Sequence, residues 1–135
     1  MTIGRRTALL GAACAATLVF LCSCASGPVI IPSGLSVAEV FQRAQDASDR
    51  DNYSLAIRYY QTVPTSFPDD INHVTWASYE VAFLYHRMGR NATALTLIND
   101  LLETYDKEGD KLPPAPHVLA SKLKVRLENV LKKKQ

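Results

Sequence analysis

The residues with the greatest capacity for chemistry in this chain are its three cysteines, which all stand near the N-terminus. Cys14, Cys22 and Cys24 lie within or just after a charge-free apolar stretch that follows Arg5 and Arg6. A cysteine thiol can bind a metal, form a disulfide or accept a covalent group. The position of these cysteines at the end of an apolar run favours covalent modification, with Cys24 as the acceptor.

The N-terminus has the three parts of an export signal. Two arginines form a basic region, residues 8–21 form an apolar region, and the small residue Ser23 precedes Cys24. Residues 21–24 resemble the lipobox of bacterial lipoproteins, with a cysteine at position 22 where a small residue is usual. The resemblance implies a signal peptide over residues 1–23, cleavage after Ser23 and a lipid on Cys24.

An uncleaved membrane anchor is the alternative interpretation of the same segment. Residues 7–26 are uncharged, but this stretch of 20 residues is barely long enough to span a bilayer. On either interpretation the rest of the chain lies outside the cytoplasm, in the bacterial cell envelope. Ala25 and Ser26 lack the aspartate that favours inner-membrane retention in enteric bacteria, so we expect the outer membrane.

Removal of the signal peptide changes the charge and the chemistry that the chain can offer. Without two arginines, 13 basic residues remain against 13 acidic ones, so basicity gives no reason to expect nucleic acid as a partner. With Cys24 acylated, no thiol is left for a disulfide or a metal. His73, His86 and His117 lack metal-ligand spacing, and no catalytic motif is present. We therefore expect no enzyme activity, metal or cofactor.

From residue 35 onward the apolar residues recur at helical spacing. Prolines, glycines and capping residues divide this region into five expected helices. They run from about residue 36 to 49, from 51 or 52 to between 64 and 68, from 71 to 88, from 91 to 106, and from 116 to 131. Ser36, Asn52 and Asn91 are the expected N-caps. The expected fold class is therefore all-α, with a tether over residues 24–34 and one helical domain over residues 35–135.

The first two pairs of expected helices are copies of one unit, 38 residues apart. Overlaying Ala56 on Ala94 also brings Ala44 onto Ala82. Small residues at such positions allow two helices to cross closely. The chain therefore contains an internal repeat, with the fifth helix left over to close it.

This repeat resembles the tetratricopeptide repeat, in which small residues stand where the two helices of a pair cross. Tyr85 matches the aromatic position of that family, and Met88-Gly89-Arg90 matches its turn. The Phe67-Pro68 ending also resembles the repeats in lipoproteins of the outer-membrane assembly machinery. The resemblance implies an α-solenoid of about two repeats and a C-terminal capping helix.

The third expected helix has two apolar faces, whereas a surface helix needs only one. One face carries Val74, Val81, Leu84, Tyr85 and Met88. The nearly opposite face carries Trp76, Tyr79, Phe83, His86 and Arg87, and Phe41 holds a corresponding place on the first helix. The family resemblance implies that this second face lines a concave, peptide-binding groove. Alternatively, the three rings pack as core beneath the fifth helix or against the first.

Two functions follow from these observations as hypotheses. The first is a membrane-anchored scaffold or adaptor that binds a segment of another envelope protein through Phe41, Trp76, Tyr79, Phe83, His86 and Arg87. The second is an accessory subunit or carrier of an envelope transport system, which holds an apolar small molecule between the third and fifth helices. An exposed Trp76 ring would favour the groove, and a buried ring would favour the core.

Overall fold

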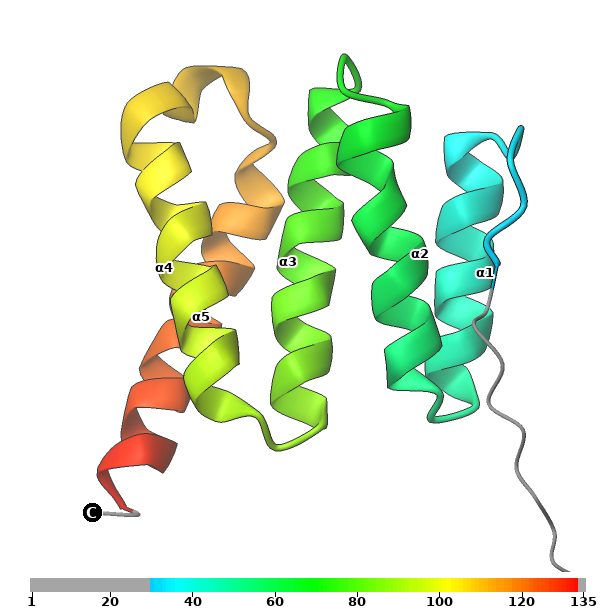
Figure 1. Ribbon diagram of the computed structural model, residues 1–135. Helices are drawn as coiled ribbons and strands as arrows, with labels where there is room; N and C mark the ends of the chain where they lie inside the picture. The colour runs from blue at the N-terminus through cyan, green and yellow to red at the C-terminus, as the bar shows by residue number, and fades with distance from the viewer. Residues whose placement is uncertain (1–29, 134–135) are drawn as a thin grey trace, which may run out of the picture.

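The computed structural model describes residues 30–133, and all regular structure in that range is helical. The helices are α1 (Val37–Asp49), α2 (Tyr53–Ser66), α3 (Ile71–Arg87), α4 (Asn91–Glu108), the short 3-10 helix η1 (Gly109–Lys111) and α5 (Pro114–Lys132). They stand side by side, with α1 at one edge and α4 and α5 at the other (Figure 1). The predicted all-α class is confirmed for this part of the chain.

The predicted signal peptide, the lipid acceptor Cys24 and the tether up to residue 29 lie outside the described residues. Over residues 30–133, none of the helices combines the length and the apolar character that a membrane span requires.

Two of the three predicted N-caps are confirmed. The Ser36 hydroxyl accepts a hydrogen bond from the Glu39 amide, and the Glu39 carboxylate accepts one of 2.8 Å from the Ser36 amide. The Asn52 side chain accepts from the amide of Leu55. The third prediction is wrong, because Arg90 is the N-cap of α4 and Asn91 is its first residue. Asn91 is buried, and its side-chain oxygen lies 2.7 Å from Nδ1 of His86.

Two helix boundaries also differ from the prediction. Helix α4 was expected to end before Lys107, but it continues to Glu108 and into η1. The Lys107 ammonium lies 2.7 Å from the Glu103 carboxylate one turn earlier, which favours continuation of the helix. Helix α5 begins at Pro114, because proline has the backbone angle of a first helical turn and needs no donor there.

Helix α3 lies between two hydrophobic cores. Its residues Ala77, Val81 and Leu84 pack with α1 and α2, whereas Tyr79 and Ala82 pack with α4 and α5. Helix α3 contacts α2, α4 and α5 directly. A helix with neighbours on two sides must be apolar on two sides, which explains its unusual pattern.

Burial follows the 38-residue interval through the fold. Ala44 on α1, Ala82 on α3 and Ala120 on α5 are each fully buried, at 0% exposure. The turns follow the same interval, because Asp51 (φ 58°) and Gly89 (φ 74°) are both left-handed. The α4–α5 link is fixed by the Tyr105 hydroxyl, which donates to the Pro113 carbonyl.

Candidate functional site

Three aromatic side chains of α3, which we call the aromatic row, form a continuous series: Trp76, Tyr79 and Phe83. Trp76 meets Tyr79 edge-on at 6.2 Å between centroids, and Tyr79 stacks on Phe83 at 6.1 Å. Such pairs hold one another in fixed orientations. Tyr79 is only 9% exposed and belongs to the core that α3 shares with α5, whereas Trp76 and Phe83 are half-buried at its border. The row is therefore anchored by Tyr79 and accessible at its two ends.

The other predicted site residues make contacts within the fold. Phe41 is half-buried and packs edge-on against Tyr60 of α2, at 5.1 Å, and His73 of α3, at 5.0 Å. His86 is bonded to Asn91 at the start of α4. Trp76 and Phe83 each contact Tyr79, and both are half-buried against the core that α3 shares with α5.

Arg87 is the one exposed member of the predicted face, and it lies over α2. Its guanidinium is 5.1 Å from the Tyr53 ring centroid and donates a hydrogen bond of 2.6 Å to the Tyr53 hydroxyl. It is also 3.8 Å from the Asp51 carboxylate. These three residues tie the end of α3 to the turn between α1 and α2.

Glu80, which the sequence reasoning missed, is the only acidic residue of α3 and lies one helical turn from both Trp76 and Phe83. It is partly buried, and burial raises the pKa of its carboxyl above the ordinary value of 4.5. Burial and the nearby Glu80 charge likewise raise the pKa values of Tyr60 and Tyr79. The sequence did offer a signal for Glu80, because it is a single acidic residue between the aromatic residues Trp76 and Phe83 of a largely apolar helix.

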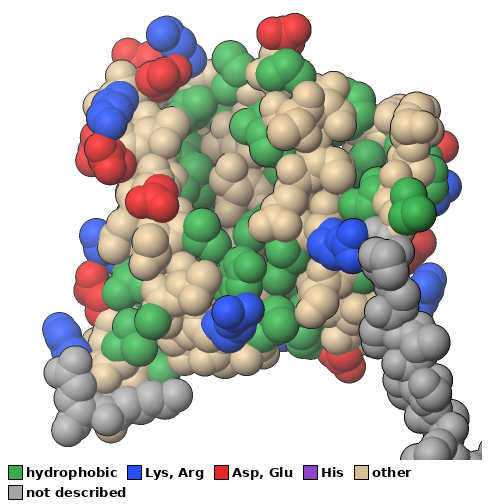
Figure 2. All heavy atoms as spheres, viewed as in Figure 1, with side chains coloured by type: hydrophobic (Ala, Val, Ile, Leu, Met, Phe, Trp, Pro, Cys, Tyr) green, Lys and Arg blue, Asp and Glu red, His purple; other side chains and the backbone are tan. Residues whose placement is uncertain are grey.

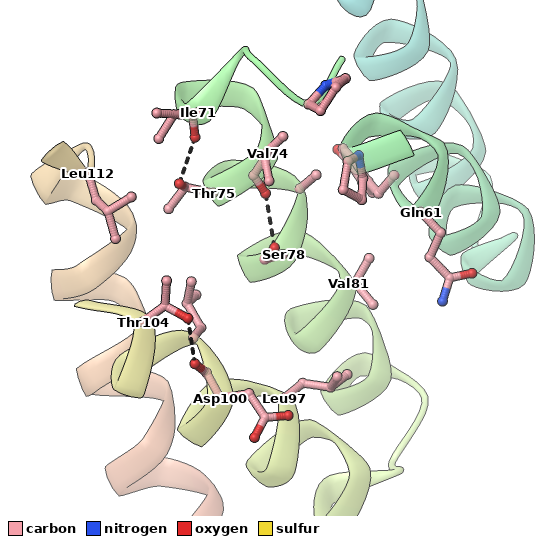
Figure 3. A pocket seen from close by; sticks show the side chains of 15 residues that line it. Gln61, Ile71, Val74, Thr75, Ser78, Val81, Leu97, Asp100, Thr104 and Leu112 are labelled. Carbon is pink, nitrogen blue, oxygen red and sulfur yellow. Dashed lines mark hydrogen bonds between the residues drawn. The ribbon is translucent and has the colours of Figure 1, made fainter. Parts of the chain in front are cut away.

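A separate hollow lies on the side of α3 that faces α2 and α4, with a volume of about 470 Å³. Figure 2 shows this face, with apolar side chains gathered near its centre and charged side chains toward the α4 edge. Val74, Ser78 and Val81 form its floor, and Leu97 and Leu112 lie on the α4 side (Figure 3). Its volume lies within the range of small-molecule pockets.

The hydroxyl groups around the hollow already have hydrogen-bond partners. Thr75, Ser78 and Thr104 each donate to the backbone carbonyl four residues earlier in their own helix (Figure 3). Among the described residues, no buried side-chain nitrogen or oxygen lacks a partner. The hollow therefore offers mainly apolar contact.

The titratable residues of residues 30–133 do not assemble into a metal site, because no group of three or more His, Cys, Asp or Glu side chains there could hold an ion. His73 instead lies 2.7 Å from the Asp70 carboxylate, which caps α3. His117 stacks on Tyr105 at 4.6 Å.

Over residues 30–133 the fold is all-helical, and successive helices pack against one another as pairs. No family model matches the chain, and no solved structure matches it. The chain is similar to an uncharacterized protein of Treponema pallidum (strain Nichols), with 33% identity over 118 residues. The similarity covers 85% of this chain and 45% of that protein, so the chain spans less than half of the relative's length.

Proposed function

We propose that this chain is a lipid-anchored adaptor of the bacterial cell envelope, built as a tetratricopeptide-like solenoid that binds a segment of another protein. The repeat is supported by Ala44, Ala82 and Ala120, which share a 38-residue interval and complete burial. Asp51 and Gly89, in the two turns, share both that interval and a left-handed backbone. Stacked copies of one helix pair require such a regular interval.

The aromatic row is the proposed centre of the binding site. The observation that carries this proposal is that Trp76 and Phe83 remain half-exposed on either side of the buried Tyr79. Aromatic side chains held by a core lose little freedom on binding and are enriched in interface hot spots. Phe41, His86 and Arg87 are engaged by other residues of the fold, so we assign them to the border of the site.

The proposal is tested by capture of partners from detergent extracts of the envelope, using the full chain and two double variants. Trp76→Ala with Phe83→Ala is expected to lose a protein that the wild type retains. Ile71→Ala with Leu97→Ala alters the hollow and serves as the matched control that retains it. The captured partner, once purified, must then bind the wild-type chain directly. This binding must change the tryptophan fluorescence of the chain, which reports on Trp76 because Trp76 is its single tryptophan. An unchanged partner set in the aromatic variant would contradict the assignment.

The lipid anchor is tested separately. Cys24→Ala is expected to abolish incorporation of labelled palmitate and to release the protein from the membrane fraction. Cys22→Ala is the matched control, because the proposed acceptor remains. If the Cys24→Ala protein stays labelled and membrane-bound, the lipoprotein interpretation is wrong.

The hollow favours a second candidate function, the binding of an apolar small molecule. The space between α3 and α5, where the sequence predicted such a ligand, contains the buried residues Tyr79, Leu123 and Leu127. The hollow between α2 and α4 is the alternative place, since the hydroxyl groups of Thr75, Ser78 and Thr104 in its lining are already bonded. The neutral dye N-phenyl-1-naphthylamine is expected to fluoresce when bound there, and Ser78→Phe to prevent it. Equal fluorescence with both proteins would exclude the hollow as the site.

A further inference from the structure

Glu80 has no cationic partner in the described part of the chain. The ion pairs there join Asp70 with His73, Asp51 with Arg87, and Glu103 with Lys107. The nearest arginine along α3, Arg87, is therefore already engaged with the turn between α1 and α2. The charge of Glu80 raises the pKa values of two neighbouring tyrosines, Tyr60 and Tyr79.

The surroundings of Glu80 do not compensate its negative charge. The side-chain amide of Gln45 donates a hydrogen bond of 2.7 Å to the Tyr60 hydroxyl and is therefore engaged with Tyr60. The charge of Arg126 on α5 acts to lower the pKa of Tyr79, whereas burial alone accounts for the raised pKa of Glu80. Burial without a compensating charge is unfavourable for a carboxylate and raises the pKa of Glu80. Glu80 is thus an uncompensated acid at the edge of the aromatic row.

Helical spacing brings this acid beside the two half-exposed rings. Trp76 is four residues before Glu80 and Phe83 is three residues after it, so all three lie on neighbouring positions of one face of α3. A carboxylate attracts a cation directly, and the face of an aromatic ring attracts it through its quadrupole. Both attractions can act on one cation only when the carboxylate and the ring are neighbours, as Glu80 is with Trp76 and Phe83.

We propose that Glu80, Trp76 and Phe83 form a recognition site for an arginine side chain in the bound protein segment. Arginine fits better than lysine, because its planar guanidinium can stack on a ring and donate two parallel hydrogen bonds to a carboxylate. This inference rests on the proposed function, in which the aromatic row binds a protein segment. It adds the chemistry of that segment, a basic residue flanked by apolar ones.

Four synthetic nonapeptides with identical Leu- and Phe-containing flanks test this inference. The central residue is arginine, lysine, glutamate or citrulline, and citrulline is the neutral isostere of arginine. Binding to the full chain in uncharged detergent is followed by the fluorescence of Trp76. The arginine peptide is expected to bind about ten-fold more tightly than the citrulline peptide, which is the scale of one charge-assisted contact.

Glu80→Gln is the decisive variant, with Glu103→Gln on α4 as the control for loss of one negative charge elsewhere. Glu80→Gln is expected to bind the arginine and citrulline peptides equally, with the citrulline affinity unchanged. Glu103→Gln is expected to keep the wild-type preference. Circular dichroism verifies that both variants are folded.

The outcomes separate this inference from the proposed function. If the wild type binds arginine and citrulline peptides equally, the arginine site is wrong while segment binding stands. A preference for arginine that survives Glu80→Gln also overturns the assignment. If no peptide binds and the partner set is insensitive to the aromatic variant, both proposals fail.

Discussion

The side-chain amide of Gln45 on α1 donates a hydrogen bond of 2.7 Å to the phenol oxygen of Tyr60 on α2. Tyr60 is 1% exposed, and burial together with the nearby Glu80 charge raises the pKa of Tyr60 to about 12. The phenol therefore remains neutral at physiological pH. This bond joins the first two helices beside the proposed binding site.

Tyr60→Phe is expected to lower the free energy of unfolding by about 0.5–1.5 kcal/mol, the usual net worth of one hydrogen bond. The effect should largely disappear when Gln45→Ala is already present, because the two side chains form one pair. Urea unfolding followed by circular dichroism measures this double-mutant cycle. Tyr53→Phe, which removes the two exposed hydrogen bonds of the Tyr53 hydroxyl with Asp51 and Arg87, is the control and should show no coupling to Gln45→Ala. Simple additivity of Tyr60→Phe and Gln45→Ala would contradict the coupling.

Ala82→Leu is expected to destabilise the fold by roughly 1–3 kcal/mol, because extra methyl groups cannot enter a packed helix crossing without strain. Ala82 is 0% exposed, whereas Ala92 on α4 is exposed. Ala92→Leu is therefore the matched control and should change stability by no more than about 0.5 kcal/mol. Thermal unfolding of the two variants measures the difference. Equal melting temperatures would mean that the crossing tolerates a large residue.

Gly89→Ala is expected to cost about 1–2 kcal/mol, the penalty for an alanine in the left-handed region. A Cβ at Gly89 would meet nothing within 4 Å, so the cost comes from the backbone angle of 74° alone. Gly89→Asn should cost less, because asparagine tolerates this conformation better. Gly109→Ala is the control: its φ of −47° is helical, and the substitution should stabilise by about 0.4–1 kcal/mol. Chemical denaturation should thus give opposite signs at the two glycines.

Glu80→Gln is expected to raise stability at about pH 7 while removing the proposed arginine preference. The pKa of Glu80 is raised in the folded state, so between its ordinary value of 4.5 and that raised value the folded state holds more protons than the unfolded state. Wild-type stability from this group therefore falls as pH rises through that window. Tyr60 and Tyr79, its titratable neighbours, are neutral there.

The stabilisation by Glu80→Gln should consequently shrink as the pH is lowered below 4.5, where the wild-type carboxyl is also neutral. Melting temperatures of both proteins across this range measure the difference. Glu39, Asp70 and Glu103, whose pKa values are lowered, destabilise both proteins equally in acid and cancel. A difference that is constant with pH would show that the Glu80 charge is not the cause.

Local sequence signals were sufficient to predict the five α-helices, but they predicted the ends of these helices less accurately. Ser36 with Glu39 and Asn52 are capping patterns that act within four residues, so they predicted the starts of α1 and α2. Asn91 looked equally suitable, yet its side chain contacts His86 of the preceding helix. That contact depends on how the turn at Gly89 brings the start of α4 against the end of α3, which the local sequence pattern does not specify.

The sequence by itself determined the all-helical fold of residues 30–133 and the 38-residue spacing of Ala44 and Ala82, because helix spacing, capping and small-residue positions are local properties of the chain. Only the tertiary structure decided what the second apolar face of α3 does. Because α3 lies between two cores, Tyr79 became buried while Trp76 and Phe83 remained at the border. The same packing left Glu80 without an ion pair among residues 30–133, since a charge is compensated or not according to which helices surround it.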